Sequence, residues 1–250
     1  MINFDKRLID LYSNESKSSY IECVTIGLGY TAVVLKDGRC GLCYTYLDSK
    51  SNCNILKGDS TFEGNCCYDI LLSLENTTNT VERSIIIAMI NAMNVVNLNN
   101  TDSDRGTLFS DLNLKSGDKV AMIGYFKPVV EQFKAKGVSV EAYDIGKKIG
   151  SEDTFYKEVV PTSNALIISA TSFINNTFSQ IMDRIGDYGK PTAVLGPSTI
   201  MNDKLYADTP VSSIGGTLPL DTDGILKAVR NGKGTPQLHK ASRKVYKKIK

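Results

Sequence analysis

The sequence predicts an α/β protein in which an N-terminal α+β meander precedes a Rossmann-like, doubly wound parallel sheet. Three observations predict this class. Residues 1–96 combine helical spacing of apolar residues with short extended stretches and a tight turn, residues 97–105 are rich in Asn, Thr and Asp, and strands and helices alternate after them. Such alternation is typical of a parallel sheet with helices on both faces. We therefore expect two domains, at residues 1–100 and 106–250.

The first part begins with apolar residues at helical spacing, which predicts an amphipathic helix over Ile2–Tyr12. Two stretches rich in β-branched residues follow, and Asp37-Gly38 after the second is a strong hairpin signal. Beyond a polar loop we expect two helices, the second with Thr80 as its N-cap. The expected strands are Tyr20–Leu28, Thr31–Leu35 and Cys40–Tyr44, the loop is 48–65, and the helices are Cys66–Leu74 and Thr80–Val96.

The second part repeats strands and amphipathic helices. Its basic tail, which holds six Lys or Arg residues between Lys240 and Lys250, is interpreted as a solvated, frayed terminal helix. The expected strands are Lys119–Phe126, Val138–Asp144, Ala165–Ala170, Thr192–Leu195 and Val211–Ile214, and the expected helices are Pro128–Lys136, Asn175–Ile185 and Asp221–Arg230.

Composition excludes several classes of protein. The 250 residues carry a formal net charge of +2, so a general nucleic-acid binder is not expected. No apolar run reaches the roughly 20 residues of a membrane span, so we expect no membrane partner. The N-terminus lacks the charged and apolar regions of a secretory signal. We therefore expect a cytoplasmic protein, and a homo-oligomer is an alternative that the sequence leaves open.

All six cysteines lie in the first 67 residues, and in a reducing compartment we expect them to be thiols. The spacing Cys40-x-x-Cys43, with Cys66 and Cys67 as partners, is compatible with Zn²⁺ or an iron–sulfur cluster. However, positions 40 and 43 of a strand point to opposite faces. The alternative is that these cysteines are small buried hydrophobic residues. Because His239 is the only histidine, a catalytic triad or a His-rich metal site is not expected.

Ligands of open parallel sheets bind beyond the carboxyl ends of the strands. The first strand ends at Gly124 and Tyr125, and the second ends at Asp144, which lies 20 residues after Gly124. At that spacing an acid of a Rossmann domain binds ribose hydroxyls. The full G-x-G-x-x-G motif is absent, so a nucleoside-type ligand and an ordinary polar strand end both remain open.

The later strand ends are also polar or glycine-rich. Hydroxyl and amide groups follow the third strand, where some of them must cap the next helix while the others are expected to meet an anion. A glycine-proline turn follows the fourth strand and could present backbone N–H groups to a carboxylate or phosphate. The candidate ligand-binding residues at these ends are Thr171, Asn175, Thr177, Gly196, Pro197, Ser198, Gly215 and Gly216.

Arg83 and Asn91 are polar residues on an otherwise apolar helix. They are eight residues apart and therefore share one face. We expect that face to look toward the second domain. The alternative is a solvated helix start and a buried, hydrogen-bonded Asn.

Seven segments, taken in their order and spacing, point to a resemblance. They are Ile26–Val33, Glu82-Arg83, Ala88–Ala92, Lys119–Phe126, Ser172–Thr177, Gly196–Thr199 and Gly215–Thr217. Together they resemble a family of uncharacterised bacterial and archaeal proteins described as "putative heavy-metal chelation" proteins. The resemblance implies a first domain like the small N-terminal domain of enolase, and a Rossmann-like domain related in shape to methyltransferases. It also implies a ligand or metal pocket between the domains, onto which Arg83, Asn91, Gly124, Asn175, Thr177 and Ser198 map.

The function expected from these features is the binding of a small anionic ligand, a metal ion or a metal chelate in the interdomain cleft, with Arg83 supplying positive charge. The alternative is a methyltransferase-like enzyme that uses a nucleoside-type cofactor such as S-adenosylmethionine, with Asp144 on the ribose. A third hypothesis is a structural partner with an empty Rossmann fold. The sequence leaves open whether any reaction is catalysed.

Overall fold

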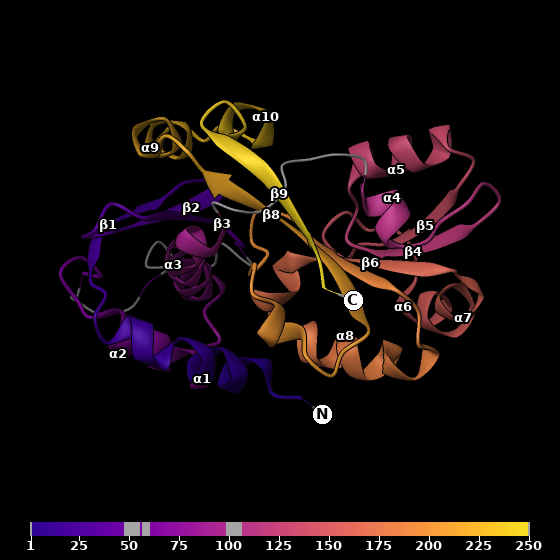
Figure 1. The fold of residues 1–250 in the computed structure, drawn as a ribbon, viewed down its shortest axis with the longest axis horizontal. Helices are drawn as coiled ribbons and strands as arrows, with labels where there is room; N and C mark the ends of the chain where they lie inside the picture. The colour runs from indigo at the N-terminus through magenta and orange to yellow at the C-terminus, as the bar shows by residue number, and fades with distance from the viewer. Residues whose placement is uncertain (1, 48–55, 57–60, 99–106, 250) are drawn as a thin grey trace.

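The computed structural model describes residues 2–47, 56, 61–98 and 107–249. Two sheets organise them, a three-stranded antiparallel sheet from the first half of the chain and a six-stranded, mostly parallel sheet from the second half (Figure 1). The predicted α/β class is therefore confirmed. Most of the predicted 48–65 loop and of the Asn-rich linker lies outside the described residues, and the domain bounds 1–100 and 106–250 stay a prediction.

The first sheet has the strand order β1-β2-β3. The predicted hairpin at Asp37-Gly38 joins β2 to β3, and Gly38 has the positive φ of 86° that such a turn favours. Three helices accompany this sheet, and α3 lies directly on β2 and β3 (Figure 1). The strands are β1 (Ile21–Ile26), β2 (Tyr30–Leu35) and β3 (Cys40–Tyr44), and the helices are α1 (Phe4–Ser16), α2 (Cys67–Leu72) and α3 (Thr80–Leu98), with a 3₁₀ turn at Ser73–Glu75.

Helix α3 is the central element of the first half. Every residue from Arg83 to Asn94 is buried, as expected for a helix that is apolar on all sides. Gly41 of β3 lets the helix approach the sheet closely, because a Cβ at that position would lie 2.1 Å from the carbonyl oxygen of Ala88. The prediction of Thr80 as the N-cap is wrong. The Asn79 side chain instead accepts hydrogen bonds from the backbone N–H groups of Val81 and Glu82.

The second sheet has the order β5-β4-β6-β7-β8-β9, and its first five strands are parallel. Helices α4 and α5 cover one face, whereas α6, α7 and α8 cover the other (Figure 1). The strands are β4 (Lys119–Ile123), β5 (Ser139–Tyr143), β6 (Ala165–Ser169), β7 (Thr192–Leu195), β8 (Val211–Pro219) and β9 (Ser242–Lys248). The helices are α4 (Thr107–Asp111), α5 (Lys127–Ala135), α6 (Glu152–Thr154), α7 (Val160–Thr162), α8 (Phe178–Ile185), α9 (Thr222–Arg230) and α10 (Thr235–Leu238), with a π turn at Phe155–Val159 and 3₁₀ turns at Ala170–Phe173, Gly186–Tyr188 and Asp203–Tyr206.

The basic tail is not a helix, so that prediction is wrong. Residues 242–248 form β9, which pairs antiparallel with β8 along seven positions. Val245 is buried while Lys244 is exposed, which fits an edge strand whose charged side chains discourage further pairing. β8 extends to Pro219, and Gly215 and Gly216 within it leave room for neighbouring side chains to lie against the strand. The predicted helix over Asn175–Ile185 begins only at Phe178.

The C-terminal helices join the two halves of the molecule. α9 and α10 pack on the face of the three-stranded sheet that α3 does not cover (Figure 1). Ile225 and Val229 of α9 meet Ala32 and Leu42 in one buried cluster. A Cβ on Gly27 would lie 2.3 Å from the carbonyl oxygen of Val229, so the β1–β2 turn touches the helix backbone. The first sheet is thus held between helices from both halves of the chain.

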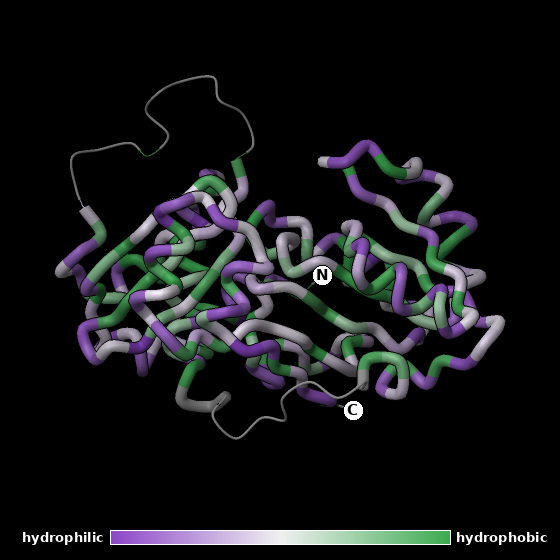
Figure 2. The backbone as a smooth tube through the Cα atoms, turned by 90° about the horizontal axis from the view of Figure 1, so that it is seen from above, coloured by the Kyte–Doolittle hydropathy of each residue, from purple (hydrophilic) through white to green (hydrophobic). Residues whose placement is uncertain are grey.

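A single hydrophobic core crosses the boundary between the two sheets. Its buried residues run from Phe4 of α1 through α3 to Leu166 of β6 and Ile214 of β8. Hydrophobic segments accordingly pass through the interior of both halves (Figure 2). Among the described residues, no helix is both long enough and apolar enough to cross a membrane.

We expect Gly41→Ala to lower the free energy of unfolding by about 1–3 kcal/mol, because the added Cβ overlaps the backbone of α3. Urea unfolding followed by circular dichroism measures the change. Gly186→Ala is the matched control. Gly186 has φ −56°, and no atom lies within 4 Å of its Cβ position. In this control the free energy of unfolding should rise by about 0.4–1 kcal/mol, because alanine restricts the unfolded chain more than glycine does. Equal midpoints for the two variants would contradict the close approach of helix and sheet.

Candidate functional site

The carboxyl ends of β4, β6 and β7 bring together several of the predicted site residues. Gly124 follows β4 with φ +84°, and a Cβ there would lie 2.7 Å from Cβ of Ser169, the last residue of β6. Gly196 follows β7 with φ +127°, and its Cβ position lies 3.9 Å from the Phe126 ring. These positive φ values suit glycine, and both glycines remain partly exposed. The strand ends therefore meet at one edge, as predicted from the parallel topology.

Asp144 holds the turns after β4 and β5 in place. Its carboxylate accepts hydrogen bonds from the backbone N–H of Tyr125 (2.9 Å) and of Lys147 (3.0 Å). The Lys147 ammonium lies 3.5 Å from the same carboxylate and donates to the carbonyl oxygen of Tyr125 at 2.7 Å. Both carboxylate oxygens are therefore engaged by the protein, and a ribose would have to share them. Sequence reasoning missed Lys147, although its position three residues after Asp144 was a usable signal.

The polar residues after β6 bond mainly to one another. Thr171 shares a hydrogen bond of 2.9 Å with the Ser169 hydroxyl. The Asn175 side chain accepts from both the hydroxyl (2.8 Å) and the backbone N–H (3.3 Å) of Thr177. These bonds shape the turn that leads into α8. Thr171, Asn175 and Thr177 nevertheless remain partly exposed.

Arg83 and Asn91 both face the second half of the chain, as predicted. The Arg83 side chain is 2% exposed, forms a two-pronged ion pair with Asp5 (2.7 and 2.9 Å), and donates to the Phe173 carbonyl oxygen at 2.8 and 3.2 Å. Asn91 donates to Leu42 of β3 at 2.9 Å and to the Pro197 carbonyl oxygen at 3.5 Å. The positive charge of Arg83 is thus compensated inside the protein.

Ser198 lies in the same contact between the two halves as Arg83 and Asn91, and we call this contact the seam. Its buried hydroxyl accepts a hydrogen bond of 2.9 Å from the backbone N–H of Tyr44, at the end of β3. Gly215 and Gly216 lie in β8, and their Cβ positions would meet Tyr246 at 2.7 Å and Met201 at 2.9 Å. Ser198 therefore contributes to the contact between the halves, whereas the two glycines make room for side chains of the second half itself.

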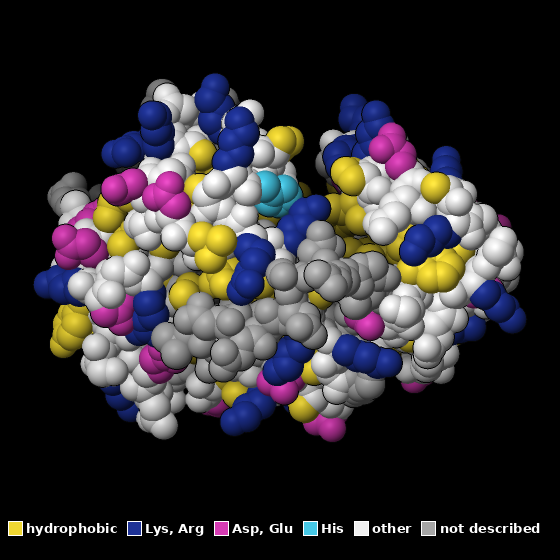
Figure 3. Space-filling view, turned by 45° about the horizontal axis from the view of Figure 1, so that its top comes forward, with side chains coloured by type: hydrophobic (Ala, Val, Ile, Leu, Met, Phe, Trp, Pro, Cys, Tyr) yellow, Lys and Arg dark blue, Asp and Glu magenta, His cyan; other side chains and the backbone are white. Residues whose placement is uncertain are grey.

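Above this seam the surface is hollowed. Figure 3 shows the hollow between the part that carries α9 and α10 and the part that carries α5. Hydrophobic side chains line it, and Lys and Arg side chains stand on its rims. Tyr125, Phe126 and Tyr246 pack at the border of the core that underlies α5. An aromatic and aliphatic surface with a basic rim suits a small anionic ligand.

The cysteines do not meet as the four-thiolate hypothesis requires. Cys40 packs with α9 and Cys43 packs with α3, on opposite faces of β3. Cys66 contacts the carbonyl oxygens of Ser16 and Lys17. Within the described part of the chain, no three His, Cys, Asp or Glu side chains are placed to hold a metal ion. These residues therefore do not fit a soft-metal site, and Cys53 lies outside the described residues.

Family models match both halves of the chain. The DUF364 model covers residues 108–248 and the DUF4213 model covers residues 9–94, and both are described as "putative heavy-metal chelation". An uncharacterized protein of Methanocaldococcus jannaschii is 21% identical over 253 residues, which cover 96% of this chain and 94% of that protein.

Two solved structures of DUF364 proteins of unknown function share the fold. The Pyrococcus horikoshii protein has a TM-score of 0.75 at 19% identity, with 98% of each chain covered. The Desulfitobacterium hafniense protein has a TM-score of 0.74 at 15% identity, with 97% of this chain and 98% of that chain covered. At these identities the likeness shows the fold alone.

We expect Arg83→Met to lower the free energy of unfolding by about 3–5 kcal/mol, because it leaves the Asp5 carboxylate without its partner. Chemical denaturation measures this change. Lys127→Met removes an exposed ion pair with Glu131 and should cost no more than about 0.5 kcal/mol. Adding Asp5→Asn to Arg83→Met should recover part of the loss. If Arg83→Met were no less stable than the Lys127→Met control, the buried pair with Asp5 would not stabilise the fold.

The thiols should differ in reactivity. Burial raises the pKa of Cys40, Cys43 and Cys67 from 9 to about 12, whereas Cys23 and Cys66 are partly exposed. At pH 8 we expect iodoacetamide to modify Cys23 and Cys66 in the folded protein, and the other three only in urea. Peptide mass spectrometry reads out each site. Modification of Cys43 as fast as Cys23 would contradict this burial.

The same thiols predict how stability depends on pH. Because a thiol of the unfolded chain ionises near pH 9 and the buried thiols ionise near pH 12, their contribution is complete below pH 9 and is lost as the pH rises toward 12. Urea midpoints between pH 8 and 11 should therefore fall. In a Cys43→Ala variant the fall should be smaller, and a fall of the same size would rule out this cause.

Proposed function

The chain belongs to the DUF364 family, described as "putative heavy-metal chelation", and we propose that it binds a small anionic ligand or an organic metal chelate beyond the carboxyl ends of β4, β6 and β7. One observation carries the proposal. The polar groups of Arg83, Asn91 and Ser198 form hydrogen bonds within the protein. The glycine turns that follow β4 and β7, by contrast, have partly exposed backbone. A ligand would therefore meet Gly124 and Gly196 rather than Arg83.

Positive charge at this edge supports an anion. Helix α5 begins at Lys127 directly beyond β4, and no side chain caps its N-terminus. The N-terminus of a helix carries partial positive charge. In α5 Pro128 has no N–H and those of Val129 and Val130 bond to the Phe126 carbonyl oxygen, so the helix dipole is the main contribution of this helix start. The exposed Lys147 ammonium donates to the Tyr125 carbonyl oxygen and lies 3.5 Å from Asp144, so it offers an ammonium donor at this edge whose charge Asp144 partly balances. We therefore assign to Lys147 the role that the sequence suggested for Arg83.

The donors on the protein favour a chelate over a bare metal ion. Soft metals select thiolates, but the described thiols are separated or buried. Backbone groups, hydroxyls and an ammonium instead recognise the carboxylates of an organic chelator. In this proposal the organic ligand, and not the protein, supplies most of the bonds to the metal. The nucleoside-cofactor alternative, with Asp144 on the ribose, stays a hypothesis.

Native mass spectrometry of anaerobically purified protein, paired with elemental analysis, tests the proposal. We expect an additional organic mass on the folded protein, with any metal present only together with that mass. In Lys147→Gln the fraction of protein that carries the organic mass should fall several-fold, because a charge-assisted contact to the ligand is removed. The control is Lys157→Gln, since Lys157 is exposed and paired only with Asp153 among the described residues. A metal that stays without organic mass and leaves on thiol alkylation would overturn the proposal in favour of the cysteines.

A further inference from the structure

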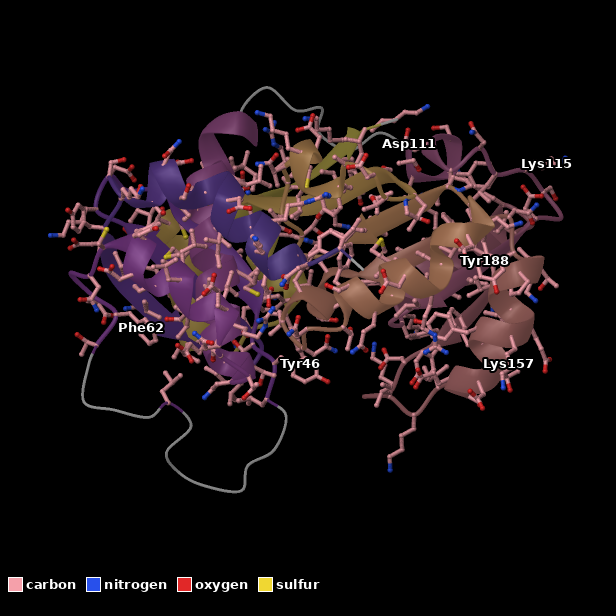
Figure 4. All side chains as sticks on the ribbon, turned by 90° about the horizontal axis from the view of Figure 1, so that it is seen from below. Tyr46, Phe62, Asp111, Lys115, Lys157 and Tyr188 are labelled. Carbon is pink, nitrogen blue, oxygen red and sulfur yellow. The ribbon has the colours of Figure 1, made fainter. Side chains whose placement is uncertain are left out.

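A groove of about 1160 Å³ runs along β1 in the N-terminal half, away from the strand-end site. Val24 and Ile26 of β1 form one wall, and Phe62 and Ile70 contribute further apolar surface. The polar segment 73–79, between α2 and α3, completes the lining. Figure 4 labels Phe62, which lies in the N-terminal half at a distance from the six-stranded sheet. None of the candidate ligand-binding residues lines this groove.

β1 is an edge strand, and part of its outer edge is open. Gly27 N–H bonds to Tyr30 O, so by antiparallel alternation Thr25 and Cys23 point their backbone groups toward β2. Val24 and Ile26 therefore point theirs outward, into the groove. The Val24 N–H donates to the Glu63 carboxylate at 2.9 Å. Within the described residues, no hydrogen bond is found for the outward groups of Ile26.

The charged side chains among the described residues of the lining are all acidic. Glu63, Asp69 and Glu82 contribute carboxylates, and none of the described lining residues is Lys or Arg. Beside it, Ile26 is 44% exposed and Leu28 is 72% exposed. Exposed apolar residues next to an open strand edge are typical of an interaction surface. The groove thus combines an unpaired strand edge, apolar walls and negative charge.

We propose that this groove binds an extended segment of a partner protein that carries Lys or Arg, and that the segment pairs with β1 as an added strand. Backbone hydrogen bonds to Ile26 and to the carbonyl oxygen of Val24 supply affinity in this mode of recognition, because the Val24 N–H already donates to Glu63. Alternate side chains of the segment supply specificity. Apolar side chains of the segment face Val24, Ile26 and Phe62, and its basic side chains meet Asp69 and Glu82. The surface is independent of the strand-end site and of the ligand proposed for it.

Fluorescence anisotropy with a labelled eight-residue peptide of alternating Lys and Val tests the proposal. We expect saturable binding that weakens with added salt. A Glu-Val peptide of equal length should not bind, and a Lys-Val peptide N-methylated at alternate residues should lose at least tenfold in affinity. Absence of Lys-Val binding at millimolar concentration would overturn the proposal. Equal binding of the methylated peptide would also overturn it, because strand pairing requires those N–H groups.

Variants locate the binding surface. The double variant Asp69→Asn/Glu82→Gln should weaken Lys-Val binding by about 1.5- to 5-fold for each carboxylate removed. The charge-matched control is Asp10→Asn/Glu131→Gln, because both residues are exposed and neither lines the groove. Equal loss of affinity in both variants would show unspecific attraction and overturn the proposal.

Hydrogen exchange of the wild-type protein tests the strand pairing itself. Bound peptide should slow the exchange of the Ile26 N–H and leave that of Ile145, which follows β5, unchanged. No slowing at Ile26 would overturn strand pairing.

Discussion

The buried guanidinium of Arg83 constrains how the two halves of the chain fit together. A charge with 2% exposure persists in a core only when its donors find acceptors. Arg83 meets this requirement by joining three segments, since it sits on α3, pairs with Asp5 of α1 and donates to Phe173 beyond β6. Around it the apolar core passes without a break from the first half to the second. The Arg83 contacts and this core therefore connect the two halves of the chain.

That constraint supports placing the proposed ligand at the strand ends rather than in the contact between the halves. The seam between the halves is filled by bonds such as Asn91 to Pro197 and Tyr44 to Ser198. The strand ends above it carry glycine turns, partly exposed aromatic rings and lysines. Backbone, aromatic and ammonium groups recognise an organic anion better than they coordinate a soft metal ion. The family description, "putative heavy-metal chelation", is compatible with this geometry when the metal is bound by an organic chelator and the protein binds that chelator.

Local signals predicted much of the fold. The Asp37-Gly38 hairpin and the strand Thr192–Leu195 needed only turn chemistry and β-branched runs. The prediction for the basic tail was wrong because its partner strand, β8, is not adjacent in sequence. The paired positions run from Ser213↔Lys248 to Pro219↔Ser242, and only this tertiary pairing makes the tail a strand. The parallel topology indicated which glycines meet at the strand ends. It could not indicate that Asp144 is engaged by Tyr125 and Lys147, or that Asp5 neutralises Arg83, because those contacts depend on the assembled structure.

A crystal structure of the anaerobically purified protein, with data collected at the absorption edge of any metal that copurifies, tests the central claim most directly. The account predicts electron density for a small organic molecule between the turns of Gly124 and Gly196, with any anomalous peak enclosed by that density. An anomalous peak bonded directly to cysteine sulfur, or ligand density in the seam that displaces Asp5 from Arg83, would contradict the account.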